Sequence, residues 1–357
     1  MRDLADSIAG ILHDYHAYND FDFTADHVIK WVEQFDAGDQ QFILEEFLHL
    51  LQQGIYVSED KGRELLMKSI NELARFYKLT PINFIKNLKV LSLQKAGKSQ
   101  ATLISIFYEE IEKNFGLKES DCGSVSDKYA LYLDDVVASG QTVFTDFGGI
   151  WDKETKTYKG GWLEETNEDG ESNFDTVISK KVIVIVNAFC IHNWQMIDYR
   201  LKMRFNGDDA IQKKIRYWHN YEIQNHRGFP NQNYNFAFPI VSVKGEEYFN
   251  SIPATLKAEG AFRKENLPPI ERFFSNAVNR QRFENIILYK GIELLAKAQK
   301  LQINHRPLGV TTPSHKTMGT GTLFFTWRNV SNTTPIVFWW AAGNWYPLFE
   351  LINRGKH

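Results

Sequence analysis

The segment YALYLDDVVASGQT, residues 129–142, decides the expected fold. Its first five residues are apolar, aromatic or small, which is typical of a short strand buried on both faces. Two adjacent acids follow, Asp134 and Asp135, and then a loop of small residues that contains Ser139 and Gly140. The residues after this segment are predicted to open a helix. A strand, an acidic pair, a small-residue loop and a helix in this order predict a site for a sugar phosphate.

Each part of the segment has a chemical reason. Backbone N–H groups of the loop and the start of the helix attract an anionic phosphate. Gly140 lets those groups approach closely, and Ser139 and Thr142 supply hydroxyl donors. Asp134 and Asp135 can accept hydrogen bonds from two vicinal hydroxyls, directly or through a divalent metal. The alternative is a plain turn in which one of the two acids only caps the next helix.

The segment resembles the ribose-phosphate signature of type I phosphoribosyltransferases, a hydrophobic run followed by Asp-Asp and a Thr/Ser-Gly-x-Thr loop. The match covers both acids, Ser139, Gly140 and Thr142. The resemblance implies that Asp134 and Asp135 bind the ribose hydroxyls of phosphoribosyl pyrophosphate (PRPP). It implies that the 5′-phosphate is bound by the loop, which comprises Val136, Val137, Ala138, Ser139, Gly140, Gln141 and Thr142. The implied cofactor is Mg²⁺, bound with the pyrophosphate substrate and in reach of the two acids.

A second strand–loop–helix pattern precedes this segment. Val90–Leu93 is a candidate strand, and Ala101–Phe115 has the apolar spacing of a helix. The loop between them suits a second anion, and it lies where phosphoribosyltransferases place their pyrophosphate loop. We assign it Lys95, Ala96, Gly97, Lys98 and Ser99. A solvated turn is the alternative, and a nucleoside-triphosphatase loop is weakly supported because Ser92 stands where its first glycine is needed.

The rest of the chain predicts the architecture around these loops. Val182–Val186 is an unbroken β-branched run, which suits a central parallel strand, and Asn187 and His192 after it are expected near the site. Ile211–Gln224 is predicted as a helix and Phe236–Val241 as a strand. The expected fold is α/β, phosphoribosyltransferase-like, with a mostly parallel sheet and helices on both faces.

Three segments are expected along the chain. Residues 1–82 are predicted to form a helical N-terminal cap, 83–250 the α/β core, and 251–357 an α+β C-terminal extension rich in aromatics. Two interpretations of that extension stay open. Its aromatic residues, with Arg328 and Asn344, could stack on a planar base, or they form a core that holds the C-terminal segment in place.

Composition narrows the class of protein. The chain has 357 residues, 43% hydrophobic and 24% charged, which is a globular composition. The net charge of −3 gives no general attraction to nucleic acid. Two cysteines argue against a disulfide framework or a four-thiolate zinc site. The charged N-terminal residues do not suit a signal peptide, and no apolar run is long enough to span a bilayer, so a soluble cytoplasmic protein is expected.

The helical start, the acidic loop and the C-terminal pattern together resemble the bacterial PRTase-CE family. Members accompany conflict systems, including retron antiphage cassettes. The resemblance implies an effector in antiviral defence, with a reverse transcriptase and its DNA–RNA product as partners. The same loops would serve a non-catalytic nucleotide-sensing or scaffolding subunit, and a DNA-directed nuclease is a third class for which the sequence shows no compact metal motif. The oligomeric state is left open.

Overall fold

The computed structural model describes residues 1–17, 21–95, 98–166, 170–192, 194–205, 207, 209–223, 234–341 and 343–351. The chain divides into two compact units, one of Met1–Glu59 with Ile223–His357 and one of Asp60–Glu222. The boundaries of these units differ from those of the three segments expected from the sequence. The division into three segments stays a prediction. Among the helices of the described residues, none has the length and apolar character needed to cross a membrane.

A four-stranded parallel sheet forms the centre of the unit Asp60–Glu222. Its order is β2-β3-β6-β7, with bounds Leu88–Val90, Tyr129–Val137, Ile183–Ile191 and Ile215–Glu222. The strand predicted at residues 129–133 continues through both acids, because β3 stays paired with β6 as far as Val137 opposite Ile191. The expected mostly parallel sheet is confirmed.

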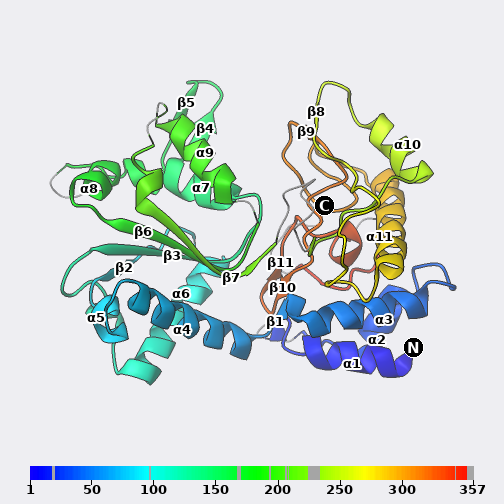
Figure 1. Cartoon of the computed structure of the whole chain (residues 1–357), viewed down its shortest axis with the longest axis horizontal. Helices are drawn as coiled ribbons and strands as arrows, with labels where there is room; N and C mark the ends of the chain where they lie inside the picture. The colour runs from blue at the N-terminus through cyan, green and yellow to red at the C-terminus, as the bar shows by residue number, and fades with distance from the viewer. Residues whose placement is uncertain are drawn as a thin grey trace. The chain divides into compact units, whose positions relative to one another are not determined.

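Helices cover both faces of this sheet, as the sequence predicts. Figure 1 shows α4 (Glu59–Phe76) and α6 (Ser99–Phe115) on one face, and α7 (Gln141–Gly148) and α9 (Trp194–Arg204) on the other. The second face buries an apolar cluster that includes Tyr132. Strand alternation sends successive side chains to opposite faces, so a strand buried on both faces reads as a continuous apolar run. The unit also contains α5 (Pro81–Ile85), η3 (Glu119–Asp121), β4 (Ile150–Asp152), β5 (Thr157–Lys159), η4 (Trp162–Glu164), α8 (Asn173–Ser179) and η5 (Gln212–Lys214).

Two predictions about secondary structure are wrong. The stretch predicted as a helix from Ile211 forms β7, because its β-branched and aromatic residues suit a strand and it pairs with β6 along its length. Residues 236–241 form no named strand. Their backbone groups bind elsewhere: Ala237 N–H donates to the Gly321 carbonyl and Phe238 N–H to the Glu284 carboxylate.

The other unit combines N-terminal and C-terminal elements. Its elements are α1 (Arg2–Leu12), α2 (Ala25–Val32), α3 (Gln40–Leu50), η2 (Leu51–Ile55), β1 (Tyr56–Val57), α10 (Val243–Ser251), β8 (Lys257–Ala258), α11 (Ala277–Lys297), β9 (His315–Lys316), β10 (Phe325–Thr326), β11 (Asn329–Val330) and η6 (Ile336–Phe338). β1 pairs in parallel with β10, which joins the two ends of the chain in one small sheet. Trp31 stacks on Phe338 at 5.5 Å and donates to the Val337 carbonyl.

The C-terminal tryptophans lie in this core. Trp327, Trp339, Trp340 and Trp345 are all buried. Trp339 donates its indole N–H to the Thr334 carbonyl and Trp345 to the Val337 carbonyl. The structure therefore favours the core interpretation of these aromatics over the stacking platform.

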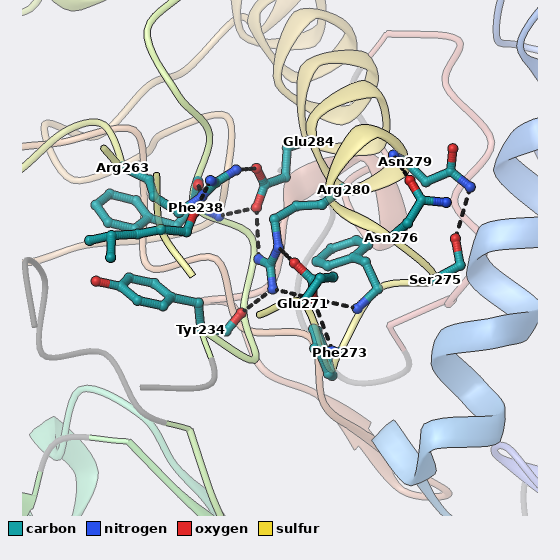
Figure 2. Close-up of polar contacts among 12 residues, drawn as sticks. Tyr234, Phe238, Arg263, Glu271, Phe273, Ser275, Asn276, Asn279, Arg280 and Glu284 are labelled. Carbon is teal, nitrogen blue, oxygen red and sulfur yellow. Dashed lines mark hydrogen bonds and ion pairs between the residues drawn. The ribbon is translucent and has the colours of Figure 1, made fainter. Parts of the chain in front are cut away.

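A buried ionic network joins α11 to the loops before it, as Figure 2 shows. Arg280 and Glu284 are fully buried, and Arg280 Nη1 lies 3.1 Å from Glu284 Oε1. Arg280 also binds Glu271, and Arg263 Nη2 binds Glu284 at 2.9 Å. Two guanidinium groups thus face two carboxylates, which balances the charge that burial would otherwise penalise.

Candidate functional site

The loop between β3 and α7 holds its shape through a glycine. Gly140 has φ +69°, in the left-handed region, and it precedes the first residue of α7. A Cβ at this position would lie 2.5 Å from Cγ1 of Ile197 on α9. Both the backbone conformation and the close packing of α9 therefore require glycine here. Glycine at this position is thus required by the structure of the loop, and its role in phosphate binding stays a prediction.

The two acids of β3 are buried at the carboxyl end of the strand. Asp134 is 7% exposed and Asp135 is 6% exposed. Each carboxylate accepts a hydrogen bond from the next backbone N–H: Asp135 N to Asp134 Oδ1 at 2.9 Å, and Val136 N to Asp135 Oδ1 at 2.8 Å. The helix-capping alternative has no support, because within the described residues the N-cap of α7 is Gly140 and neither acid accepts a hydrogen bond from the first turn of that helix.

Burial away from water changes the ionisation of the acidic pair. Burial, followed by the neighbouring Asp135 charge, raises the pKa of Asp134 well above its usual range. Asp135 Oδ2 is buried and has no hydrogen-bond partner among the residues described. A buried acceptor without a partner lowers the stability of the folded protein unless a donor or a cation reaches it. Its chemistry fits a ligand hydroxyl or a magnesium ion.

The loop residues divide into a buried and an exposed set. Val137 and Ala138 are buried, so an anion would meet the backbone of this part and not its side chains. Ser139, Gln141 and Thr142 are exposed. Gln141 N–H lies 3.3 Å from Ser139 Oγ, and the Gln141 side chain donates to Thr145. The exposed hydroxyls and the first turn of α7 therefore form the accessible part of the candidate phosphate site.

The second loop lies between β2 and α6. Lys95 and Lys98 are exposed, and Ser99 is the first residue of α6, while Ala96 and Gly97 lie outside the described residues. Gln100 is fully buried, and its Oε1 accepts hydrogen bonds from Leu93 N at 2.8 Å and Gln94 N at 2.9 Å. This side chain holds the start of the loop against the first turn of the helix.

Side-chain hydrogen bonds connect the start of the β2–α6 loop with the strand and the helix that flank the other predicted loop. Gln94 Nε2 donates to the Tyr132 hydroxyl at 2.8 Å and to Asp146 Oδ2 at 3.1 Å. The Tyr132 hydroxyl donates to the same carboxylate oxygen at 2.6 Å. The triad therefore connects the β2–α6 loop with β3 and α7, and burial raises the pKa of Asp146. Sequence reasoning missed this triad, because Gln94 and Asp146 are 52 residues apart and carry no motif.

The next strand adds two further polar residues at the same end of the sheet. Asn187 lies opposite Leu133 in the β3–β6 register and is buried, with Oδ1 unpartnered among the described residues. His192 is buried and donates its backbone N–H to the Val137 carbonyl at 2.8 Å. Both lie near the end of β3, as the sequence predicts.

The acidic pair is the candidate for binding a metal ion. Within the described ranges, no cluster of three or more His, Cys, Asp or Glu residues is placed to hold a metal ion. Two adjacent carboxylates with substrate oxygens are a usual way to bind Mg²⁺, and the unpartnered Asp135 Oδ2 fits that use. The roles of Asp134, Asp135 and both loops in binding stay predictions.

A mostly parallel sheet with helices on both faces is consistent with a phosphoribosyltransferase-like protein. The model of the PRTase-CE family matches residues 28–351, and the chain belongs to that family. The resemblance found in the sequence is thereby confirmed at the level of the family. No curated protein and no solved structure matches the chain.

Proposed function

We propose that this chain binds PRPP, or a related ribose 5-phosphate, and transfers its phosphoribosyl group. The observation that supports the proposal is the Gln94 contact, which ties the start of the loop after β2 to Tyr132 of β3 and Asp146 of α7, the strand and helix on either side of the other loop. PRPP carries one phosphate and one pyrophosphate on a single ribose. Two anion loops beside two hydroxyl-binding carboxylates match that arrangement of charges.

Each part of the site has one task in this proposal. Asp135 accepts a ribose hydroxyl through Oδ2, and Asp134 supports it in the same strand. The loop of residues 136–142 binds the 5′-phosphate through backbone N–H groups and the hydroxyls of Ser139 and Thr142. Lys95, Lys98 and Ser99 bind the pyrophosphate. Mg²⁺, when bound with the pyrophosphate, adds positive charge at the leaving group.

Catalysis would rest on position and charge. The bond from ribose C1 to the pyrophosphate oxygen breaks, the electron pair leaves with the pyrophosphate, and an acceptor forms a new bond to C1. The oxocarbenium-like ribose is stabilised by the nearby carboxylates, and the lysines stabilise the departing pyrophosphate. No nucleophile from the chain is required.

A thermal unfolding experiment tests the binding part of the proposal. PRPP with Mg²⁺ should raise the Tm of the wild-type chain, because a ligand that binds only the folded state stabilises it. Asp135→Asn should remove most of that increase while the unliganded Tm shows a folded protein. The matched control is Asp127→Asn, the same change at an exposed aspartate before β3. An equal increase in Tm for Asp135→Asn would contradict the assignment.

A non-catalytic sensor is the competing function, since the same two loops serve binding without turnover. Release of pyrophosphate from PRPP, measured with a panel of purine and pyrimidine bases and with nucleic acid as acceptors, separates the two functions. An enzyme releases pyrophosphate with one of these acceptors. A sensor binds PRPP and releases none.

The family supports a role in bacterial antiphage defence, with a reverse transcriptase and its DNA–RNA product as expected partners. The efficiency of phage plating on cells that carry the complete system tests this role. Loss of protection with Asp135→Asn, and full protection with Asp127→Asn, would tie defence to the site. Equal protection with both variants would separate defence from ribose-phosphate binding.

A further inference from the structure

Arg200 of α9 lies against the candidate phosphate loop. Ile197 and Arg200 are three residues apart, so they share one face of the helix. Ile197 packs on Gly140, where an added Cβ would lie 2.5 Å from it, and Arg200 Nη1 donates to Oε1 of Gln141. The guanidinium carbon is 5.9 Å from the centre of the Phe144 ring. Arg200 is therefore placed at the first turn of α7.

No carboxylate in the described part of the chain pairs with the positive charge of Arg200. Among the described residues, Arg200 makes no ion pair, and the bond to Gln141 uses one of its five N–H donors. Arg204, one turn further along α9, differs in this respect, because it pairs with Glu164 and donates to the Gly148 carbonyl. The two arginines have similar chemistry, but the charge of Arg204 is paired with a carboxylate, whereas the described residues show no such pairing for Arg200.

The local charges explain why a cation is needed at this place. Asp135 and Asp146 lie in or beside the site, and carboxylates at these positions repel a phosphate. The loop supplies backbone N–H groups and hydroxyls but no cationic side chain of its own. Lys95 and Lys98 belong to the other loop, to which the proposal assigns the pyrophosphate.

We propose that Arg200 of α9 binds the 5′-phosphate of the ligand directly, as a cationic residue supplied from outside the phosphate loop. This inference rests on the proposed function, since it names a binding residue of the same site. The guanidinium group presents parallel N–H donors that match two phosphate oxygens, which gives both charge and geometry. Gln141 holds the side chain in place before the ligand arrives.

Calorimetric titration with two separate ligands tests the inference. Arg200→Gln should weaken the binding of ribose 5-phosphate by about tenfold or more, because it removes a charge-assisted contact. Inorganic pyrophosphate, which the proposal assigns to the other loop, should bind Arg200→Gln and the wild-type chain with the same Kd. Arg200→Lys should recover part of the affinity, because it restores the charge without the paired donors.

Lys202→Gln is the matched control, since it removes the same charge from an exposed position of the same helix. It should leave both affinities unchanged. Equal ribose 5-phosphate affinity for Arg200→Gln and the wild-type chain overturns the role of Arg200 alone. A similar loss in Lys202→Gln, or a matching loss of pyrophosphate binding in Arg200→Gln, also overturns it, because the effect would then be general. A folded wild-type chain that binds neither ribose 5-phosphate nor PRPP overturns the proposed function and this inference with it.

Discussion

The side chain of Gln94 donates a hydrogen bond to Asp146 Oδ2 at 3.1 Å and so ties the loop after β2 to the helix after β3. Tyr132 completes the contact from β3. Neither Gln94 nor Asp146 belongs to a motif, yet their contact connects the start of one loop with the helix that follows the other, and the proposal assigns these loops to the two ends of PRPP.

Gln94→Ala should therefore weaken a ligand that spans both loops. We expect the affinity for PRPP to fall by about tenfold, which corresponds to one hydrogen bond in this setting. The affinities for ribose 5-phosphate and for pyrophosphate, each bound by one loop, should change less. Titration calorimetry measures all three. Gln195→Ala, a change at an exposed glutamine of α9, is the control. An unchanged PRPP affinity would show that the contact does not position the loops.

Gly140→Ala should destabilise the fold for two separable reasons. Gly116 has nearly the same backbone, with φ +67° against +69°, but open space around it. Gly116→Ala should lower the free energy of unfolding by about 1–2 kcal/mol through backbone conformation alone. Gly140→Ala should lower it by about 1–3 kcal/mol more, because the new Cβ collides with Ile197.

A double-mutant cycle with Ile197→Ala isolates that collision. In chemical denaturation, the extra cost of Gly140→Ala should shrink toward the cost of Gly116→Ala when Ile197 is already alanine. Strictly additive effects would mean that α9 does not press on the loop, and would also weaken the placement of Arg200 at α7.

Asp134 should make the stability of the protein fall as the pH rises. Its folded pKa is raised well above the usual value by burial and by Asp135, so the folded chain keeps a proton that the unfolded chain has already lost. Stability is then highest near and below the ordinary carboxyl pKa and decreases as the pH rises from there toward the folded pKa. Asp134→Asn, which stays neutral, should remove this contribution and be more stable than the wild-type chain near neutral pH.

Denaturation midpoints measured from pH 4 to pH 8 test this sign, with Asp127→Asn as the exposed control. The gap between Asp134→Asn and the wild-type chain should widen with pH, while Asp127→Asn should follow the wild-type curve. A gap that narrows with rising pH would mean that Asp134 is stabilised as a carboxylate in the folded chain.

The buried network around Arg280 should dominate the stability of its unit. Glu284→Ala removes the carboxylate that faces both Arg280 and Arg263. Arg280 keeps its pairing with Glu271, and Arg263 is left with no carboxylate partner among the described residues. Removal of one partner from such a network costs about 3–5 kcal/mol. Glu247→Ala on the exposed side of α10 is the control. A small shift in the denaturation midpoint for Glu284→Ala would contradict the importance of this network.

The sequence predicts those elements that are specified by a pattern of neighbouring residues. The segment from Tyr129 to Thr142 carries its strand, acids and glycine in one continuous pattern, so its fold follows from neighbours along the chain. β6 was equally clear from its β-branched run. β7 was missed because a short aromatic stretch fits helical and strand spacing alike, and only its pairing with β6 decides between them.

The residues of the site that the sequence does not predict are brought together by long-range packing. Gln94 and Asp146 are 52 residues apart, and Arg200 and Gln141 are 59 residues apart. Single glutamines and arginines occur on most exposed helices, so only the folded arrangement identifies these. The burial of Asp134 and Asp135 was also not predicted, because it comes from the helices that cover both faces of the sheet.

The most direct test of the central claim is calorimetric titration of the purified chain with PRPP and Mg²⁺. The comparison is the double variant Asp134→Asn/Asp135→Asn, with Asp127→Asn as the charge-matched control at an exposed site. The proposal predicts saturable one-site binding by the wild-type chain and by the control, and loss of binding by the folded double variant. Binding of PRPP by the double variant with wild-type affinity, or no binding by the folded wild-type chain, would contradict it.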